Sequence, residues 1–163
     1  MKRLALDLST KSSGWAVFDD EELVDYGCIT ASSNDLIKRI QKIIYGLDDV
    51  LEKYKVDKIV VEEVRPETGV QNIKTHRALM WLQGAVAIFV HEKCGKLDIE
   101  YLYPSQWRKI CGIKTGSGVR RTSLKPKDIE FVKNKYNITV NDDIADAIGI
   151  GYASAMIDKF NWE

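Results

Sequence analysis

The stretch Lys2-Arg-Leu-Ala-Leu-Asp7 opens the chain, and Gly14-Trp-Ala-Val-Phe18 follows it after a polar segment. Apolar residues dominate both stretches, which is typical of β-strands, and Ser9-Thr10 between them indicates a turn. A third strand pattern covers residues 23–29, after the acidic turn at 19–22. Short connections join antiparallel neighbours, so these residues predict a three-stranded antiparallel meander with Asp7 at the exit of its first strand.

The rest of the chain alternates helical and strand patterns. Apolar residues recur with the helical period over 34–54, and a long helix is predicted over 73–93, with Gly95 as its stop signal. Short strands are predicted at 58–62 and 99–103. The C-terminal third predicts a short helix at 105–110, a loop at 112–123 that we expect to be mobile without a bound partner, a helix from Lys125 or Pro126 to 136, and a last helix from 142 to about 159 with Asn141 as its N-cap.

This order of elements predicts an α/β fold, a mixed five-stranded sheet flanked by helices, in one domain over residues 1–163. The length and a hydrophobic content of 45% are sufficient for one core. No apolar run approaches the roughly 20 residues that span a bilayer, and polar residues come too early for a signal peptide. We therefore expect a cytoplasmic protein, whose three widely spaced cysteines are reduced thiols rather than zinc ligands.

Charge is distributed unevenly although the formal net charge is zero. Nine lysines and arginines lie between Pro104 and Ile138, against two acidic residues, whereas acidic residues cluster at 19–25. Such a basic stretch can bind a polyanion while carboxylates elsewhere bind metal. The sequence therefore favours a nucleic-acid partner despite its neutral average.

Four carboxylates stand where strands end or on one face of a helix. Asp7 ends the first strand, Glu62 ends Ile59-Val-Val, and Asp143 and Asp146 are three residues apart, on one face of the last helix. Each has another interpretation: an aspartate at a strand end can cap a turn, and acids in a first helical turn are stabilised by the helix dipole. Asp142 competes with Asp143 for the same role.

The carboxylates nevertheless suggest a single chemistry. A charge at a buried hairpin is costly unless a cation or hydrogen-bond donors meet it. Carboxylates are the ligands that Mg²⁺ and Mn²⁺ prefer, and two such ions about 3.5–4 Å apart can promote phosphodiester hydrolysis. Small residues at Ala145, Ala147 and Gly149 would let the last helix approach the sheet closely. We therefore predict a two-metal nuclease site at Asp7, Glu62, Asp143 and Asp146.

With these residues placed, the chain resembles the RuvC family of Holliday junction resolvases over nearly its full length. The matching segments are Leu4-Ala-Leu-Asp7 with Gly14, Val60-Val-Glu62-Glu-Val64, Leu82-Gln-Gly84, Tyr103-Pro-Ser-Gln-Trp-Arg108 and Asp143-Ile-Ala-Asp146-Ala147. The resemblance implies a ribonuclease-H-like homodimer that uses Mg²⁺, for which Mn²⁺ can substitute, to nick four-way junctions and other branched DNA, leaving 5′-phosphate and 3′-hydroxyl ends. The family's four acids map onto the four carboxylates above.

The resemblance also implies two catalytic basic residues, which map onto Arg108 and Lys125. Arginine at the first position suits neutralisation of phosphate charge better than proton transfer. For contacts to DNA we expect six further basic residues: Arg65, Lys74, Arg77, Arg120, Arg121 and Lys127. Apolar residues of the 73–93 helix, namely Met80, Trp81, Val86, Ile88 and Phe89, are expected to contribute to the dimer contact.

Two departures from the family pattern concern substrate choice. Arg65-Pro66 stands where the family can place an aromatic residue that stacks on an opened base, and the loop at 112–123 is expanded. Both would suit a bacteriophage member with looser sequence selection, acting in a bacterium or an infected cell. Nothing in the sequence identifies a helicase partner.

Three other functions share some of these sequence features. A sugar-kinase or actin-like phosphotransferase shares an opening hairpin with an aspartate, but it needs a second large domain. A nuclease acting on structured RNA is not discriminated by the basic stretch. A junction-binding protein without catalysis is disfavoured because all four acidic positions are filled.

Overall fold

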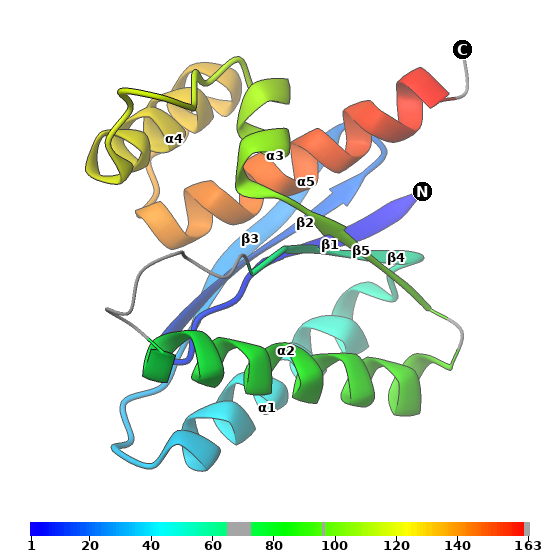
Figure 1. Ribbon diagram of the computed structural model, residues 1–163. Coiled ribbons are helices and arrows are strands. Elements are labelled where there is room, and N and C mark those ends of the chain that lie inside the picture. The colour runs from blue at the N-terminus through cyan, green and yellow to red at the C-terminus, as the bar shows by residue number, and fades with distance from the viewer. Residues whose placement is uncertain (65–72, 96, 162–163) are drawn as a thin grey trace.

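The computed structural model describes residues 1–64, 73–95 and 97–161, apart from the side chain of Arg121. Its centre is a five-stranded sheet in the order β3-β2-β1-β4-β5 (Figure 1). The antiparallel part consists of β1 (Lys2–Asp7), β2 (Ser12–Asp19) and β3 (Glu22–Thr30). The strands β4 (Lys58–Glu62) and β5 (Asp98–Leu102) complete the sheet in parallel with β1. The predicted meander and mixed sheet are confirmed.

Helices cover both faces of this sheet. On one face lie α1 (Leu36–Tyr54) and α2 (Ile73–Cys94), and on the other lie α3 (Pro104–Ile110), α4 (Arg121–Tyr136) and α5 (Asp142–Asn161) (Figure 1). The strand period of two divides β1 between the faces: Leu4 and Leu6 join the α1–α2 core, whereas Ala5 packs with residues of α3 and α5. The α/β fold class is therefore confirmed.

Helix α5 lies close to the sheet because the residues on its inner face are small. Ala145, Ala147 and Gly149 are buried, as expected from their size. A Cβ atom on Gly149 would stand 2.6 Å from the ring of Trp107, and one on Gly151 would stand 2.4 Å from Phe18. Close packing of this helix brings its N-terminal turn to the end of β1.

The predicted start of α4 is wrong. The helix begins at Arg121, so Pro126 lies inside it and the basic loop ends earlier than expected. A proline there removes the bond to the carbonyl four residues before it, and its ring crowds that carbonyl, which disfavours a continuous helix. The helix continues because Asp128 and Val132 are buried against the rest of the protein. By contrast, the predicted cap of α5 is confirmed, since Asn141 Oδ1 accepts a hydrogen bond from the amide of Ile144 at 2.9 Å.

Candidate active site

The strand order brings Asp7 and Glu62 to the same edge of the sheet. Asp7 is the last residue of β1 and Glu62 the last of β4, and these strands are parallel neighbours, with Leu6 opposite Val61. Carboxyl ends of neighbouring parallel strands meet at one edge, which is where ligands bind in many α/β proteins. Asp143 and Asp146 reach this edge from the N-terminal part of α5.

The electrostatics of these carboxylates show that they share one environment. Burial, followed by the negative charges of Glu62 and Asp143, raises the pKa of Asp7 well above its ordinary value. Burial and the charge of Asp7 likewise raise the pKa of Asp146, to about 10. Carboxylates that raise one another's pKa in this way are short of compensating positive charge. The structure thus brings together the four acids that the sequence suggested.

Protein donors hold two of these acids in place. Trp107 Nε1 donates to Glu62 Oε2 at 2.7 Å, and Gln83 Nε2 donates to the main-chain carbonyl of Glu62 at 2.9 Å. Ser12 Oγ donates to Asp143 Oδ2 at 2.6 Å. Trp107 is fully buried, and sequence reasoning missed its hydrogen bond to Glu62. It missed the roles of Ser12 and Gln83 as well, because no local pattern distinguishes a serine that reaches a carboxylate or a glutamine that reaches a main-chain carbonyl.

Arg108 lies inside the protein rather than on its surface. Its guanidinium pairs with the buried Asp128, contacts Asp146 at 3.5 Å and stacks 4.2 Å from the ring centre of Trp107. No local pattern predicts that Asp128, one of the two acids in the basic stretch, pairs with Arg108. These contacts place Arg108 beside a candidate metal ligand, and its expected contact with a DNA phosphate stays a prediction.

The two neighbouring acids at the start of α5, Asp142 and Asp143, have different partners. The amine of Lys125 pairs with Asp142, and Asp143 is bound by Ser12 instead. Lys125 remains half-exposed at the edge of the site. Asp142 is therefore engaged by a lysine at the surface, which leaves Asp143 as the member that faces Asp7.

Both the chemistry of these ligands and one unpartnered atom suit a hard cation. All four candidate ligands are carboxylates, and Asp146 Oδ1 is buried without a hydrogen-bond partner. Within the described ranges, no three Asp, Glu, His or Cys side chains already stand close enough together to ligate one ion.

The predicted DNA-contacting residues occupy two regions. Lys74 and Arg77 are exposed on α2, and Arg120 and Lys127 are exposed on the other side of the sheet, at α4 (Figure 1). Arg65 and the side chain of Arg121 lie outside the described part of the chain.

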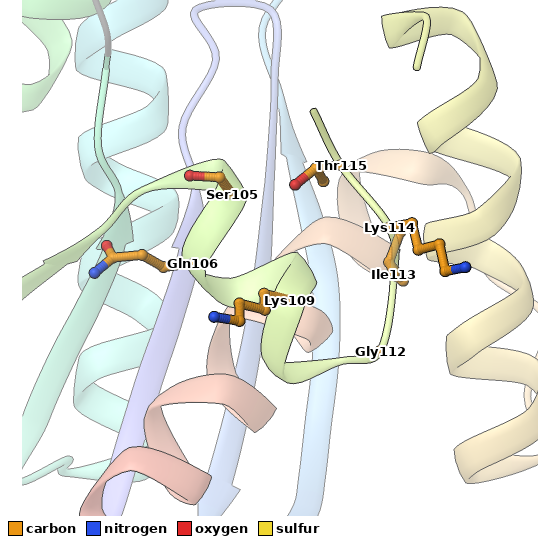
Figure 2. A pocket seen from close by; sticks show the side chains of 7 residues that line it. All are labelled: Ser105, Gln106, Lys109, Gly112, Ile113, Lys114 and Thr115. Atoms are coloured by element: carbon orange, nitrogen blue, oxygen red, sulfur yellow. The ribbon is translucent and has the colours of Figure 1, made fainter. Parts of the chain in front are cut away.

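A pocket beside α3 is separate from the acids. Seven residues line it: Ser105, Gln106, Lys109, Gly112, Ile113, Lys114 and Thr115 (Figure 2). Figure 2 shows Lys114 extending from the loop after α3, whereas Lys109 extends from α3 itself. Lys114 also lines a second pocket, together with Lys127 and Lys135 of α4. None of the four carboxylates lines either pocket, so these basic hollows are not the candidate catalytic centre.

Comparison with known proteins points to one family. The family model described as crossover junction endodeoxyribonuclease RuvC matches residues 4–153. RuvC of Ehrlichia ruminantium (strain Welgevonden) is 29% identical over 92% of this chain and 93% of its own, and RuvC of Helicobacter pylori (strain G27) is 27% identical over 96% and 97%. The structure of Thermus thermophilus RuvC in complex with a Holliday junction substrate has the same fold, with a TM-score of 0.78 at 16% identity over 98% of this chain and 96% of that one.

Proposed function

The chain belongs to the RuvC family of crossover junction endodeoxyribonucleases, and on this premise we propose that it nicks four-way DNA junctions by metal-dependent hydrolysis of phosphodiesters. The observation that carries the proposal is the convergence of Asp7, Glu62, Asp143 and Asp146 at one edge of the sheet. The described helices and strands all belong to the one fold that carries this site, so we treat residues 1–163 as a single nuclease domain.

The four carboxylates would hold Mg²⁺, or Mn²⁺ in its place, with two ions per site. When bound, such ions supply an activated water and stabilise the leaving 3′ oxygen, which leaves 5′-phosphate and 3′-hydroxyl ends. The protein's own contribution is orientation. Trp107 and Ser12 hold Glu62 and Asp143 by hydrogen bonds from side chains on the neighbouring α3 and β2. The half-exposed Lys125 is placed to meet the negative charge of a phosphate.

Branched DNA would lie over this edge of the sheet, with basic residues of α2 and α4 on either side of it. The six basic residues named from the sequence are the proposed contacts, including Arg65 and Arg121. Since these contacts would be mainly to phosphates, they position the DNA without reading its sequence. We propose that the protein acts on this substrate in the cytoplasm of a bacterium or an infected host cell. The structure itself contributes one fact here: no helix in its described ranges is long and apolar enough to span a membrane.

A symmetric junction calls for two active sites related by a two-fold axis, so we propose a homodimer. Helix α2 offers exposed apolar side chains for this contact: Met80, Trp81 and Ile88. Val86, also named from the sequence, is buried in the core of the same chain and is unsuited to it. A monomer in light scattering at micromolar concentration, with and without DNA, would contradict the dimer.

The decisive experiment compares cleavage of a synthetic four-way junction, a linear duplex and an RNA–DNA hybrid. Each substrate is incubated with Mg²⁺, Mn²⁺, Ca²⁺ or EDTA, with the wild type and with Asp7→Asn. We expect junction cleavage with Mg²⁺ or Mn²⁺ only, and junction binding without cleavage by the variant. Undiminished cleavage by Asp7→Asn would exclude the proposed site. Preferential cleavage of the hybrid would identify an RNA-directed nuclease instead.

A further inference from the structure

The ion pair between Arg108 and Asp128 lies next to Asp146, one of the four acids. The side chain of Asp128 is fully buried and that of Arg108 is 10% exposed. Arg108 Nε lies 3.1 Å from each carboxylate oxygen of Asp128, and Nη2 lies 2.9 Å from Oδ2. This is a bidentate, charge-assisted arrangement, which holds a guanidinium in one orientation.

Arg108 reaches Asp146 through one long contact only. Its Nη2 is 3.5 Å from Asp146 Oδ2, while Asp146 Oδ1 is buried and no donor in the described ranges binds it. The carboxyl group of Asp128 itself also lies within hydrogen-bonding reach of the Asp146 carboxyl group. A guanidinium presents its donors as a fork that fits a carboxylate. If Asp128 lost its charge, the fork of Arg108 would bind Asp146 more fully, because a buried cation needs an anionic partner.

We propose that Asp128 is a positioning residue for the nuclease reaction. By engaging Arg108 bidentately, it restricts the arginine to one oxygen of Asp146 and leaves Oδ1 available to the catalytic cation. The inference rests on the proposed function, since it requires a cation at the four acids. It also gives Arg108 a role inside the protein, between Asp128 of α4 and Asp146 of α5, in place of a contact to a DNA phosphate.

The experiment measures Mn²⁺ binding to the intact protein without DNA, by electron paramagnetic resonance. Asp128→Asn keeps the shape of the side chain and removes its charge. We expect its Mn²⁺ affinity to fall about tenfold, the effect of one charge-assisted hydrogen bond diverted from Asp128 to Asp146. Adding Arg108→Met should restore the affinity to about threefold below the wild type or better, because the competing guanidinium is then absent.

A matched control exists at the other end of α5. Asp158 pairs at 3.2 Å with Arg3, another buried arginine, close to where β1 begins. Asp158 also pairs with Lys58 at 3.1 Å, so Asp158→Asn removes ion pairs to two basic residues away from the four acids. We expect it to lower the melting temperature while Mn²⁺ affinity stays at the wild-type value. Junction affinity in Ca²⁺ should be the same for the wild type, Asp128→Asn and Arg108→Met.

Several results would overturn the proposal. Wild-type Mn²⁺ affinity in Asp128→Asn would do so, as would a loss that Arg108→Met does not recover. A large loss of junction affinity in Arg108→Met would also overturn it, because it would show that the arginine contacts a DNA phosphate. If Asp128→Asn does not fold, the double variant Arg108→Met, Asp128→Leu replaces the pair by apolar side chains; it should bind Mn²⁺ like the wild type, and weaker binding would refute the proposal. A wild type that neither binds Mn²⁺ nor cuts junctions would instead remove the proposed function.

Discussion

A Cβ atom on Gly14 would stand 1.9 Å from the main-chain carbonyl oxygen of Asp143. Gly14 lies opposite Asp7 in the β1–β2 pair, so the hairpin that carries one acid touches the helical turn that carries another. Asp7 and Asp143 owe their proximity to this contact, because any larger residue would push α5 away from the sheet.

Replacing Gly14 by alanine tests that contact. We expect Gly14→Ala to lower the free energy of unfolding by about 1–3 kcal/mol, the usual cost of overpacking, and to reduce junction cleavage more than tenfold. Chemical denaturation and the cleavage assay measure the two effects. Gly84→Ala is the control for stability alone, because nothing in the same chain lies within 4 Å of a Cβ atom there. Its cleavage is not compared, since Gly84 shares the face of α2 proposed for the dimer contact. Alanine inside this exposed helical position should stabilise by up to about 1 kcal/mol.

Ser12→Ala should slow cleavage without unfolding the protein. The hydroxyl of Ser12 is the donor to Asp143 Oδ2, and one such hydrogen bond to a charged group contributes about 1.5–3 kcal/mol, which is at least about tenfold in rate. Single-turnover cleavage at saturating Mg²⁺ measures the change. Ser12→Thr retains the hydroxyl and should keep most of the rate; equal losses in both variants would show that the hydrogen bond is unimportant.

Trp107→Phe removes the indole N–H that binds Glu62 and keeps an aromatic ring in the core. We expect a loss of about 1–3 kcal/mol in unfolding free energy, because the Glu62 carboxylate loses a buried donor. Cleavage should fall by at least about tenfold, since the Glu62 carboxylate loses the hydrogen bond from Trp107 that orients it. The contact between Trp107 and Gly149 predicts that Gly149→Ala destabilises as well. A Trp107→Phe variant with unchanged cleavage would refute the positioning role.

Salt dependence tests the basic contacts of α4. Lys127→Ala should weaken junction binding, and the slope of log affinity against log salt should become about 0.9 less steep if one phosphate contact is lost. Fluorescence anisotropy in Ca²⁺ between 50 and 200 mM salt, roughly the range over which such slopes are read, gives both values. Lys38→Ala is the matched control, since Lys38 is exposed on α1, across the sheet from α4. Identical slopes for the two variants would remove Lys127 from the interface.

The contact between Tyr54 and Asp25 predicts a pH-dependent contribution to stability. The Tyr54 hydroxyl donates to Asp25, and this hydrogen bond lowers the pKa of the carboxyl in the folded state. A lowered folded pKa stabilises the protein above the unfolded value of about 3.9, and this contribution is lost as the pH falls through the folded pKa. Tyr54→Phe should therefore destabilise at pH 6 and converge on the wild type in acid. Denaturation curves at several pH values measure the difference, and a constant difference would contradict the coupling.

Local pattern was sufficient for most elements and for naming all four acids as candidates. Asp7 and Glu62 were identifiable because each ends an apolar strand, and Asn141 because capping residues precede helices. The same reasoning failed at Pro126, since a proline in the second turn of a helix resembles one at its first position. The helix continues through Pro126 because Asp128 is buried, and no residue next to Asp128 in the sequence predicts that burial.

The sequence by itself determined the strands, the helices and the acidic residues that end or begin them, because periodicity and capping act between residues a few positions apart. Only the tertiary structure decided how those acids are held. Ser12 and Asp143 are 131 positions apart, Trp107 and Glu62 are 45 apart, and Arg108 and Asp128 are 20 apart. Contacts over such separations depend on how α3, α4 and α5 pack on the sheet, which no local pattern encodes.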